Sequence, residues 1–397
     1  MQRVLIIGVD SSAAARSAKN AGYDVYASDH FGDQDLKAVC TDSLSVIKQE
    51  KGVTCGFFSD SYDPETLVQN AKVLIEKYNV DGAILTSGLE DYPSLLNQFI
   101  DGIPLIGNSL DSIIKVRDKI RFYRELGRLK VNYPKTGLAC SLEEAYSMAK
   151  DIGYPVLCKP EKGFGGAGIR KAINRKELKD AYENASSVSG NVLVQKCIDG
   201  IHASASLIST KDKVSILTLN KQFLGLTQSC QMEPFGYCGN LVPLDENIRS
   251  VDIGVFEKII RHFSLIGSNG VDFVVSKGKP FVIEVNPRLQ GTLECVERVL
   301  RINLVKSHVD ASVNRMLPKT RNSVKKICVR LILYASQRLV MPTLESKDDL
   351  RDIPLSGVIV EKGEPVCSVI TESSESKNCV NKAFLRAQKV YRTLKPL

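Results

Sequence analysis

A short stretch around residue 278 constrains the fold more than any other part of this 397-residue chain. Two runs rich in β-branched and aromatic residues flank a turn-forming cluster centred on Gly278. A hairpin folded about that glycine places Asp272 opposite Glu284, because the two positions average to 278. Side chains alternate along a strand, so Asn286 and Arg288 face the same way as Glu284. The pattern predicts two carboxylates, an amide and an arginine on one face of a hairpin.

The predicted cluster of oxygen atoms requires a cation. Asp272, Glu284 and Asn286 would repel one another unless a positive charge lay between them. Magnesium is held by one or two carboxylates together with phosphate oxygens, whereas zinc prefers His or Cys. We therefore predict a Mg²⁺ site beside nucleotide phosphates, where Mn²⁺ could substitute. An ordinary hairpin with a solvated polar face is the alternative that these residues alone leave open.

The length and composition fit a soluble protein of two or three domains. Apolar residues make up 43% and charged residues 25%, as in globular rather than disordered chains. No apolar run approaches the roughly 18 residues that a membrane span needs, and the opening run Val4–Gly8 is too short for a secretory signal. Eleven scattered cysteines without a CxxC pair predict reduced, mostly buried thiols. We therefore expect a cytoplasmic protein with no membrane partner.

The net charge of +8 is unevenly spread along the chain. The segment 311–344 holds no acidic residue and seven basic ones: Arg315, Lys319, Arg321, Lys325, Lys326, Arg330 and Arg338. Such a stretch could guide nucleic acid or anionic substrates inward. Because no nucleic-acid motif or interleaved aromatic residues accompany it, we predict a solvated connector with its basic side chains in water, and no nucleic-acid partner.

The first region, residues 1–108, alternates short apolar runs with helical stretches. Predicted strands cover Arg3–Gly8, Asp24–Ser28 and Val80–Thr86. Ser11 or Ser12 is expected to cap the helix that follows the first strand. This βαβ pattern predicts a parallel sheet. The first turn lacks the second and third glycines of a dinucleotide fingerprint, so we predict a plain strand-to-helix turn and no NAD site.

The second region, residues 109–315, opens with a helix around Lys119. A strand over Tyr154–Lys159 leads into a loop with four glycines: Gly163, Gly165, Gly166 and Gly168. Glycine-rich backbone can wrap closely around an anion with its N–H groups as donors, and Lys159 at the strand end can reach the same phosphates. The loop does not end in Gly-Lys-Ser/Thr, so it is not a P-loop. A mobile surface loop is the alternative.

The last region, residues 316–397, mixes short strands with a terminal helix. Predicted strands cover 329–334, 357–360 and 365–370. Apolar residues at helical spacing near the end are Val380, Phe384, Ala387, Tyr391 and Leu394. One stripe of this helix is therefore predicted to be buried, with a structural role.

Taken in order, a lysine, a second lysine with a glycine loop, and an acidic hairpin that ends in Glu284–Arg288 resemble the ATP-grasp superfamily. The resemblance covers essentially the whole chain and is to the biotin-carboxylase-like branch and an archaeal-type carboxylate–amine ligase branch. It implies an α/β and α+β fold. The expected parts are a parallel-sheet domain at 1–108, an ATP-grasp nucleotide-binding fold at 109–315 with a glycine-rich lid at about 155–195, and a small mixed α/β domain at 316–397.

The resemblance also implies a role for each matching residue. Lys119 and Lys159 correspond to the two nucleotide lysines, and the loop from Gly163 to Gly168 to a lid over the triphosphate of ATP. Asp272, Glu284 and Asn286 match the magnesium ligands, and Arg288 matches an arginine that steadies an acyl phosphate. The run 192–200 is similar to the adenine-binding hinge. There the backbone near Lys196 and Ile198 would meet the base, and the Gln195 side chain would lie close by.

One stretch departs from the family pattern, and another resembles an element of one branch. Many relatives place an acidic residue for the ribose where this chain has Ile201–Ser204, so His202 or Asp199 could serve instead. A surface histidine is the alternative for His202. The segment 235–243 resembles a Tyr-x-Gly-Asn element of an archaeal-type branch and could line the acceptor site, although a β-turn would also explain its glycines.

The expected function is that of an ATP-dependent carboxylate–amine ligase that works through an acyl phosphate and releases ADP and phosphate. Its partners would be a small-molecule carboxylate and an amine. A carboxylase that uses bicarbonate is one alternative, because the Glu284–Arg288 signature with Gln290 also suits that branch. An ATP-binding regulatory module without chemistry is another. The sequence leaves the two substrates and the oligomeric state open, with a homodimer as one option.

Overall fold

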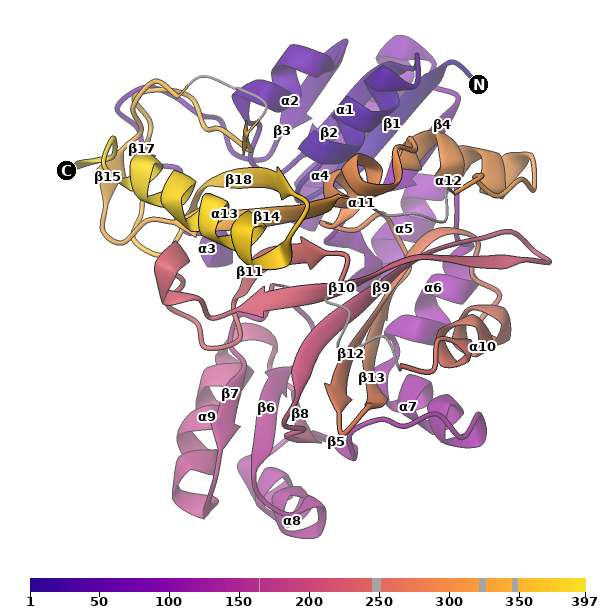
Figure 1. Cartoon of the computed structure of the whole chain (residues 1–397), viewed down its shortest axis with the longest axis vertical. Helices are drawn as coiled ribbons and strands as arrows, with labels where there is room; N and C mark the ends of the chain where they lie inside the picture. Colours follow the sequence, from indigo (N-terminus) through magenta and orange to yellow (C-terminus); the bar gives the residue numbers. More distant parts are fainter. Residues whose placement is uncertain (164, 245–250, 321–325, 345–348) are drawn as a thin grey trace.

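The computed structural model describes residues 1–163, 165–244, 251–320, 326–344 and 349–397. The chain begins with a four-stranded parallel sheet in the order β3-β2-β1-β4. Its strands are β1 (Arg3–Gly8), β2 (Asp24–Asp29), β3 (Asp42–Ser45) and β4 (Gly82–Leu85). Figure 1 shows this sheet at the top of the molecule, in indigo. The predicted parallel sheet is confirmed.

Helices cover both faces of this parallel sheet. They are α1 (Ser12–Asn20), α2 (Gln34–Val39), α3 (Phe58–Ser61), α4 (Pro64–Tyr78), η1 (Leu89–Asp91), α5 (Pro93–Ile100) and α6 (Leu110–Arg117). Val4 and Ile6 pack into one core cluster with α1, while the alternate residues Leu5 and Ile7 pack into another with α4. Burial on both faces explains why β1 is an unbroken apolar run. Ser11 precedes α1 as predicted, but its side chain makes no capping hydrogen bond.

A second, antiparallel sheet has the strand order β5-β8-β6-β7. Its strands are β5 (Thr136–Ala139), β6 (Val156–Pro160), β7 (Arg170–Ala172) and β8 (Val192–Lys196). Two helices pack against it, α8 (Leu142–Ile152) and α9 (Arg175–Ser189). Figure 1 shows this unit projecting at the bottom of the molecule. The glycine loop connects β6 to β7, so it lies at the edge of a small, separately packed unit.

The largest sheet has eight strands in the order β13-β12-β9-β10-β11-β14-β18-β16. They are β9 (Ile201–Ser209), β10 (Val214–Leu224), β11 (Tyr237–Val242), β12 (Gly267–Ser276), β13 (Lys279–Asn286), β14 (Ile327–Tyr334), β16 (Leu350–Arg351) and β18 (Pro365–Ser373). β11 pairs antiparallel with β14, so strands of the last region continue the central sheet. The remaining strands, β15 (Leu339–Val340), β17 (Ile359–Val360) and β19 (Lys395–Pro396), form a three-stranded sheet.

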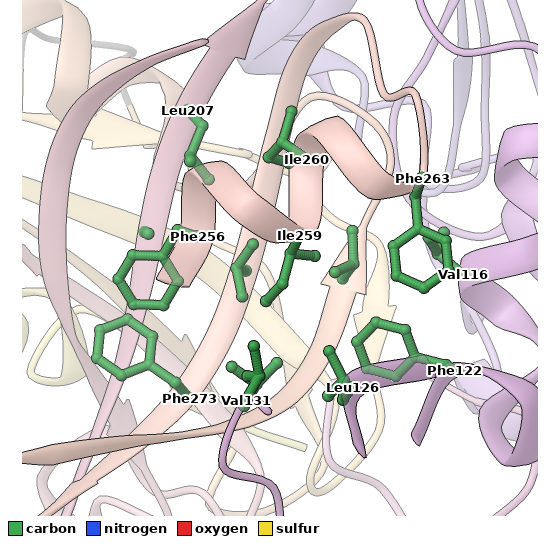
Figure 2. Packing of buried hydrophobic residues seen from close by; sticks show 14 of the residues in the cluster. Val116, Phe122, Leu126, Val131, Leu207, Phe256, Ile259, Ile260, Phe263 and Phe273 are labelled. Atoms are coloured by element: carbon green, nitrogen blue, oxygen red, sulfur yellow. The ribbon is translucent and has the colours of Figure 1, made fainter. Parts of the chain in front are cut away.

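One face of the β12–β13 hairpin is buried against helices. Figure 2 shows Phe273 of β12 and Leu207 of β9 packed against Phe256 and Ile259 of α10. The helices around the central sheet are α7 (Lys119–Arg128), α10 (Gly254–His262), α11 (Leu293–Leu300), α12 (Leu304–Val313), α13 (Ser376–Tyr391) and the short η2 (Thr227–Ser229). Phe122 and other residues of α7 complete this core. Because alternate residues point to opposite faces, burial of Phe273 turns Asp272 toward the other side.

The terminal helix has the predicted structural role. In α13, Ala383 and Ala387 are buried, and Phe384, Tyr391 and the following Leu394 pack against the same core. All eleven cysteines, each within the described residues, are free thiols, and six are buried, as predicted. In the part of the chain that the structure describes, no helix is long and apolar enough to cross a bilayer.

Candidate active site

The hairpin has the predicted register at its functional end. Asp272 lies opposite Glu284, and Gly270 lies opposite Asn286. The turn itself consists of Lys277 and Gly278, both with positive φ, and is therefore centred between them rather than on the glycine. A β-bulge after Asp272 adds Ile283 to the second strand and restores the predicted pairing. The carbonyl of this extra residue is free of the strand ladder and accepts a 2.7 Å hydrogen bond from the hydroxyl of Tyr123.

Asp272 lies among amides rather than cations. The side-chain amides of Gln222 and Asn286 each donate to one of its carboxylate oxygens at 3.0 Å. Burial raises the pKa of Asp272 to about 7, and the charge of Glu284 adds to the effect. The two carboxylates therefore share a region in which a positive charge would be stabilised.

Glu284 is surrounded by three basic side chains. Lys119 donates to its Oε2 at 2.7 Å, and a guanidinium nitrogen of Arg117 lies 3.7 Å from the same oxygen. Burial alone would raise the pKa of Glu284, but the charges of Lys119, Arg117 and Lys159 outweigh it and hold the pKa well below its usual range. Both predicted nucleotide lysines therefore lie close to the predicted metal face.

Lys159 reaches the site from the end of β6. Its ammonium lies 3.4 Å from the Oε1 of Gln195, whose amide nitrogen donates to the Tyr123 hydroxyl at 2.8 Å and to Thr136 at 2.9 Å. Burial lowers the pKa of Lys159 to about 8. Gln195 thus links Lys159 to the bulged strand through Tyr123, a connection between two sheets.

Arg288 leaves the hairpin and contacts the N-terminal sheet. Its Nε donates to Glu90 at 2.6 Å, and a terminal nitrogen donates to the Oδ1 of Asn286 at 3.2 Å. Glu90 lies just beyond the carboxyl end of β4, in the 3-10 helix η1. Its neighbour Asp91 binds Arg117 through two hydrogen bonds of 2.6 and 2.7 Å. Adjacent acidic residues therefore hold two arginines at the site.

The glycine loop is docked on the first residue of β11 and on the segment before it. Gly163, Gly165, Gly166 and Gly168 all have positive φ. The backbone N–H of Tyr237 donates to the carbonyl of Gly165 at 2.8 Å, and a Cβ at Gly166 would lie 1.9 Å from the carbonyl oxygen of Phe235. This close approach explains why position 166 requires glycine. Phe164 lies outside the described residues.

A charged pair joins the same two segments. Arg170 of β7 donates from both terminal nitrogens to the carboxylate of Glu233, one of these bonds being 2.9 Å long. The N–H of Gly168 also donates to Glu233, at 3.3 Å. The Arg170–Glu233 pair, which we call the latch, therefore connects the end of the glycine loop to the central sheet.

The predicted hinge, residues 192–200, comprises β8 and the residues that follow it. Gln195 is buried, while Lys196 and Ile198 are partly exposed. The backbone N–H of Lys196 donates to the carbonyl of Lys135 at 2.8 Å, and its ammonium donates to the carbonyls of Gly153 and Tyr154 at 2.8 and 3.0 Å. The side chain of Lys196 therefore connects this segment to the loop between α8 and β6.

The predicted metal ligands fit a divalent cation that shares its shell with phosphate. Asp272 and Glu284 supply two carboxylates, and Asn286 supplies an amide next to Asp272. The amide oxygen of Asn286 faces Arg288, so it has to turn over to join the carboxylates. No group of three or more His, Cys, Asp or Glu side chains among the described residues could hold a metal alone. This set suits an ion that takes further oxygen ligands from a nucleotide.

The basic segment 311–344 differs from its prediction at Arg330. This residue is only 5% exposed, and its guanidinium donates to Asp10 at 2.9 Å and to Asp352 at 2.6 Å. The prediction of a solvated connector is wrong here, because β14 is an interior strand of the central sheet. Arg321 and Lys325 lie outside the described residues, while Arg315, Lys319, Lys326 and Arg338 are exposed.

The segment 235–243 forms strand β11 rather than a turn around its second glycine. Gly239 has a φ of +125°, and a Cβ there would lie 1.9 Å from the carbonyl oxygen of Arg330. Close approach of β14 therefore explains this glycine. The amide of Asn240 donates to the Tyr237 hydroxyl, and its Oδ1 has no hydrogen-bond partner among the described residues. His202, on the same sheet, is partly buried 6.4 Å from the ring of Phe235.

Several site residues escaped the sequence analysis: Glu90, Asp91, Arg117, Tyr123 and Gln222. Two of them had a usable signal. Arg117 lies two residues before Lys119, and Glu90 follows a strand of a parallel sheet, where ligands tend to bind. Asp91, Tyr123 and Gln222 gave none, because their roles depend on contacts with residues far away in the sequence.

Residues 116–292 match the family described as the ATP-grasp domain. An uncharacterized protein of Methanocaldococcus jannaschii is 25% identical over 384 residues, covering 96% of this chain and 91% of that protein. The arginine-specific large chain of carbamoyl phosphate synthase from Bacillus subtilis is 24% identical over 323 residues, covering 80% of this chain. This chain spans only 30% of that synthase chain.

Solved structures share the fold at low sequence identity. The biotin carboxylase domain of 2-oxoglutarate carboxylase from Hydrogenobacter thermophilus, a dimer in complex with MgADP and bicarbonate, has a TM-score of 0.74 at 18% identity. The match covers 100% of this chain and 91% of that domain. The L-amino acid ligase of Bacillus licheniformis has a TM-score of 0.72 at 14% identity, covering 99% of this chain and 98% of the ligase.

Proposed function

Residues 116–292 form an ATP-grasp domain, and from that premise we propose that the chain is an ATP-dependent carboxylate–amine ligase. One observation carries the proposal. Two lysines from different elements, Lys119 and Lys159, lie around Glu284 on the polar face of the hairpin, and Arg288 connects that face to the N-terminal sheet. Binding of phosphates, a cation and a carboxylate substrate next to one another requires basic and acidic side chains that lie close together, as these do.

A carboxylate resists attack by an amine because of its negative charge, and transfer of the γ-phosphoryl group from ATP removes this obstacle. Lys119 and Lys159 would offset the charge that develops on the phosphates. Asp272, Glu284 and Asn286 would hold a magnesium ion, which when bound would supply positive charge to offset that of the phosphates. Arg288, whose guanidinium is oriented by Glu90, would bind the acyl phosphate. The amine then displaces phosphate and leaves an amide.

A bicarbonate-using carboxylase is the second candidate. The likeness to a biotin carboxylase domain supports it. In this chain the amide of Gln290 donates to the backbone carbonyl of Arg288 at 3.1 Å and packs against Gly270, so it is engaged within the protein. We rank this candidate below the ligase, and a regulatory module that only binds ATP below both. A homodimer is part of the proposal, because the similar domain of Hydrogenobacter thermophilus is a dimer.

Hydroxylamine trapping tests the proposed function. Purified protein with Mg-ATP, hydroxylamine and a library of carboxylic acids should give an acyl hydroxamate with the correct acid, because hydroxylamine attacks an acyl phosphate as an amine would. ADP release that depends on bicarbonate and needs no amine would instead support the carboxylase. ATP binding without phosphate release across the library would support the regulatory module.

A further inference from the structure

Five ring-bearing side chains gather where the carboxyl ends of β2 and β4 face the proposed site; we call them the aromatic cluster: His30, Phe31, Phe58, Tyr62 and Tyr92. The centroid of His30 lies 4.8 Å from that of Phe31 and 4.7 Å from that of Phe58. Phe58 stacks on Tyr62 at 5.3 Å, and Tyr62 lies 6.2 Å from Tyr92. These spacings are those of interacting rings.

Three separate parts of the chain supply the cluster. His30 and Phe31 follow β2, and Tyr92 follows η1. Phe58 and Tyr62 come from a long excursion between β3 and α4, which is anchored on the C-terminal segment. The N–H of Cys55 donates to the carbonyl of Ile359 at 2.9 Å, and the N–H of Ile359 donates back to the carbonyl of Val53 at 3.0 Å. The fold thus brings together rings that lie far apart in the sequence.

A short chain of contacts links the cluster to Arg288. A Cβ on Gly88 would lie only 2.8 Å from the Tyr62 hydroxyl, so that hydroxyl lies against the Gly88 backbone. The N–H of Gly88 donates to one carboxylate oxygen of Glu90 at 2.6 Å, and the other oxygen accepts from Arg288 at 2.6 Å. On the far side, the ammonium of Lys162 in the glycine loop lies 5.8 Å from the Tyr92 ring centroid. The cluster therefore lies beside the group that would hold an acyl phosphate.

His30 gives a second indication of a ligand. It is 0% exposed, and its Nδ1 has no hydrogen-bond partner in the described part of the chain. The other ring nitrogen, Nε2, lies 3.5 Å from the hydroxyl of Ser61. Burial lowers the pKa of His30 to about 4, so the ring is neutral near pH 7, and Nδ1 donates or accepts according to the tautomer. A buried polar nitrogen of this kind is costly unless it gains a hydrogen-bond partner.

The other four rings keep part of their surface exposed, and their faces and edges favour another ring over an alkyl chain. We propose that the aromatic cluster binds the ring of an aromatic carboxylic acid whose carboxylate points toward Arg288. This inference rests on the proposed function and names the class of its acid substrate. The nucleotide would occupy the opposite side of Arg288, on the polar face of the hairpin.

Binding can be measured without turnover by means of a fluorescent indole acid. The chain contains no tryptophan whose emission would overlap with that of the probe. Fluorescence anisotropy of indole-3-propanoate, excited at the red edge of the indole band where tyrosine absorbs little, reports its binding to the full chain in Mg-ADP. We expect 3-phenylpropanoate to displace this probe at about tenfold lower concentration than hexanoate does. Equal displacement by the two acids, or no binding of the indole acid, would overturn the proposal.

A pair of neighbouring residues gives a matched comparison. Phe58→Leu keeps an apolar side chain but removes a ring of the cluster, and should weaken binding of 3-phenylpropanoate at least fivefold with unchanged ADP affinity. Phe57→Leu changes an adjacent ring that is 44% exposed and outside the cluster, and should leave binding unchanged. Equal effects of the two substitutions contradict the proposal. If the Phe58 variant does not fold, the ranking of acids on the unmodified protein still decides.

The two proposals fail in different ways. Selective binding of the aromatic acids without formation of a hydroxamate supports the aromatic subsite and removes the ligase. Hydroxamate formation from short aliphatic acids alone, without binding of the indole acid, supports the ligase and removes the aromatic subsite.

Discussion

Glu90 accepts a hydrogen bond of 2.6 Å from the Nε of Arg288, although 198 residues separate them in the sequence. The pair joins the carboxyl end of β4 to the residue that follows the acidic hairpin. Both side chains are largely buried, at 4% and 12% exposure. A charged pair in that setting fixes the direction of the guanidinium more firmly than a surface pair would.

Glu90→Gln should therefore affect acid activation more than nucleotide binding. The amide keeps the shape of the side chain but removes its charge, so Arg288 loses its orienting partner. We expect the rate of hydroxamate formation to fall about 10- to 100-fold while the KM for ATP changes less than twofold, and the free energy of unfolding to fall by about 1–3 kcal/mol. Steady-state kinetics and urea unfolding test both parts. The exposed Glu65→Gln is the control, and a KM effect alone would contradict the assigned role of Glu90.

Glu284→Ala should abolish most of the activity. Its carboxylate is the meeting point of Lys119, Arg117 and Lys159, and it is a predicted cation ligand. Loss of a preorganised electrostatic group of this kind costs at least ~3 kcal/mol of transition-state stabilisation, a drop in kcat/KM of about 100-fold or more. Glu257→Ala on the exposed face of α10 provides the comparison. Near-normal turnover in the Glu284 variant would be incompatible with the proposed function.

The latch should control how well the glycine loop is ordered. Glu233→Arg places two cations together and should raise the KM for ATP about 3- to 30-fold, and should also expose the loop between Glu161 and Gly168 to limited proteolysis. The exchanged pair, Arg170→Glu with Glu233→Arg, should recover part of both properties. The exposed pair Lys179–Glu183 on α9, reversed in the same way, should have no effect. Failure of the exchanged pair to recover the proteolytic protection would argue against a direct latch.

Stability should fall at mildly acidic pH through His308. This side chain is 2% exposed, its Nε2 donates to the carbonyl of Ile106 at 2.9 Å, and its Nδ1 accepts from the N–H of Ser268 at 2.8 Å. Both nitrogens are satisfied only in the neutral ring, and burial lowers the pKa to about 4. The unfolded chain takes up this proton near pH 6.5, so the stabilisation is present above that pH and is lost progressively as pH falls toward 4.

The size of that effect follows from the shift. About 2.5 pH units of separation correspond to about 3 kcal/mol of lost stability. Urea unfolding of His308→Gln between pH 4 and 7 should show a weaker pH dependence than the unmodified chain, since glutamine does not titrate. His262→Gln, on the exposed end of α10, serves as the control. Identical slopes for His308→Gln and the unmodified chain would rule out this assignment.

Local patterns predicted the part of the site that local geometry builds. The register of Asp272 and Glu284 followed from the spacing of two strands about a glycine, and the structure confirms it. The turn differs in detail from the prediction, because it is centred between Lys277 and Gly278. This shifts the strand pairing by one residue, and the bulge at Ile283 shifts it back. The strands of the N-terminal sheet could likewise be predicted from their apolar runs alone.

Residues that act through distant partners could not be predicted in this way. Arg330 looked like one of many surface cations, yet its partner Asp10 lies 320 residues earlier. Gln222 gave no local pattern, since its partner Asp272 is on a strand 50 residues further along the chain. Only the assembled topology brings these charges within hydrogen-bonding distance, and that information is not present in any single window of sequence.

The pairing of β11 with β14 limits how this protein can be divided. A chain that stopped before Ile327 would leave the backbone N–H and carbonyl groups of β11 without the ladder that now satisfies them. Such an open edge is a template for self-association. Any C-terminal segment exchanged between relatives therefore has to supply a strand that pairs with β11 in the same register.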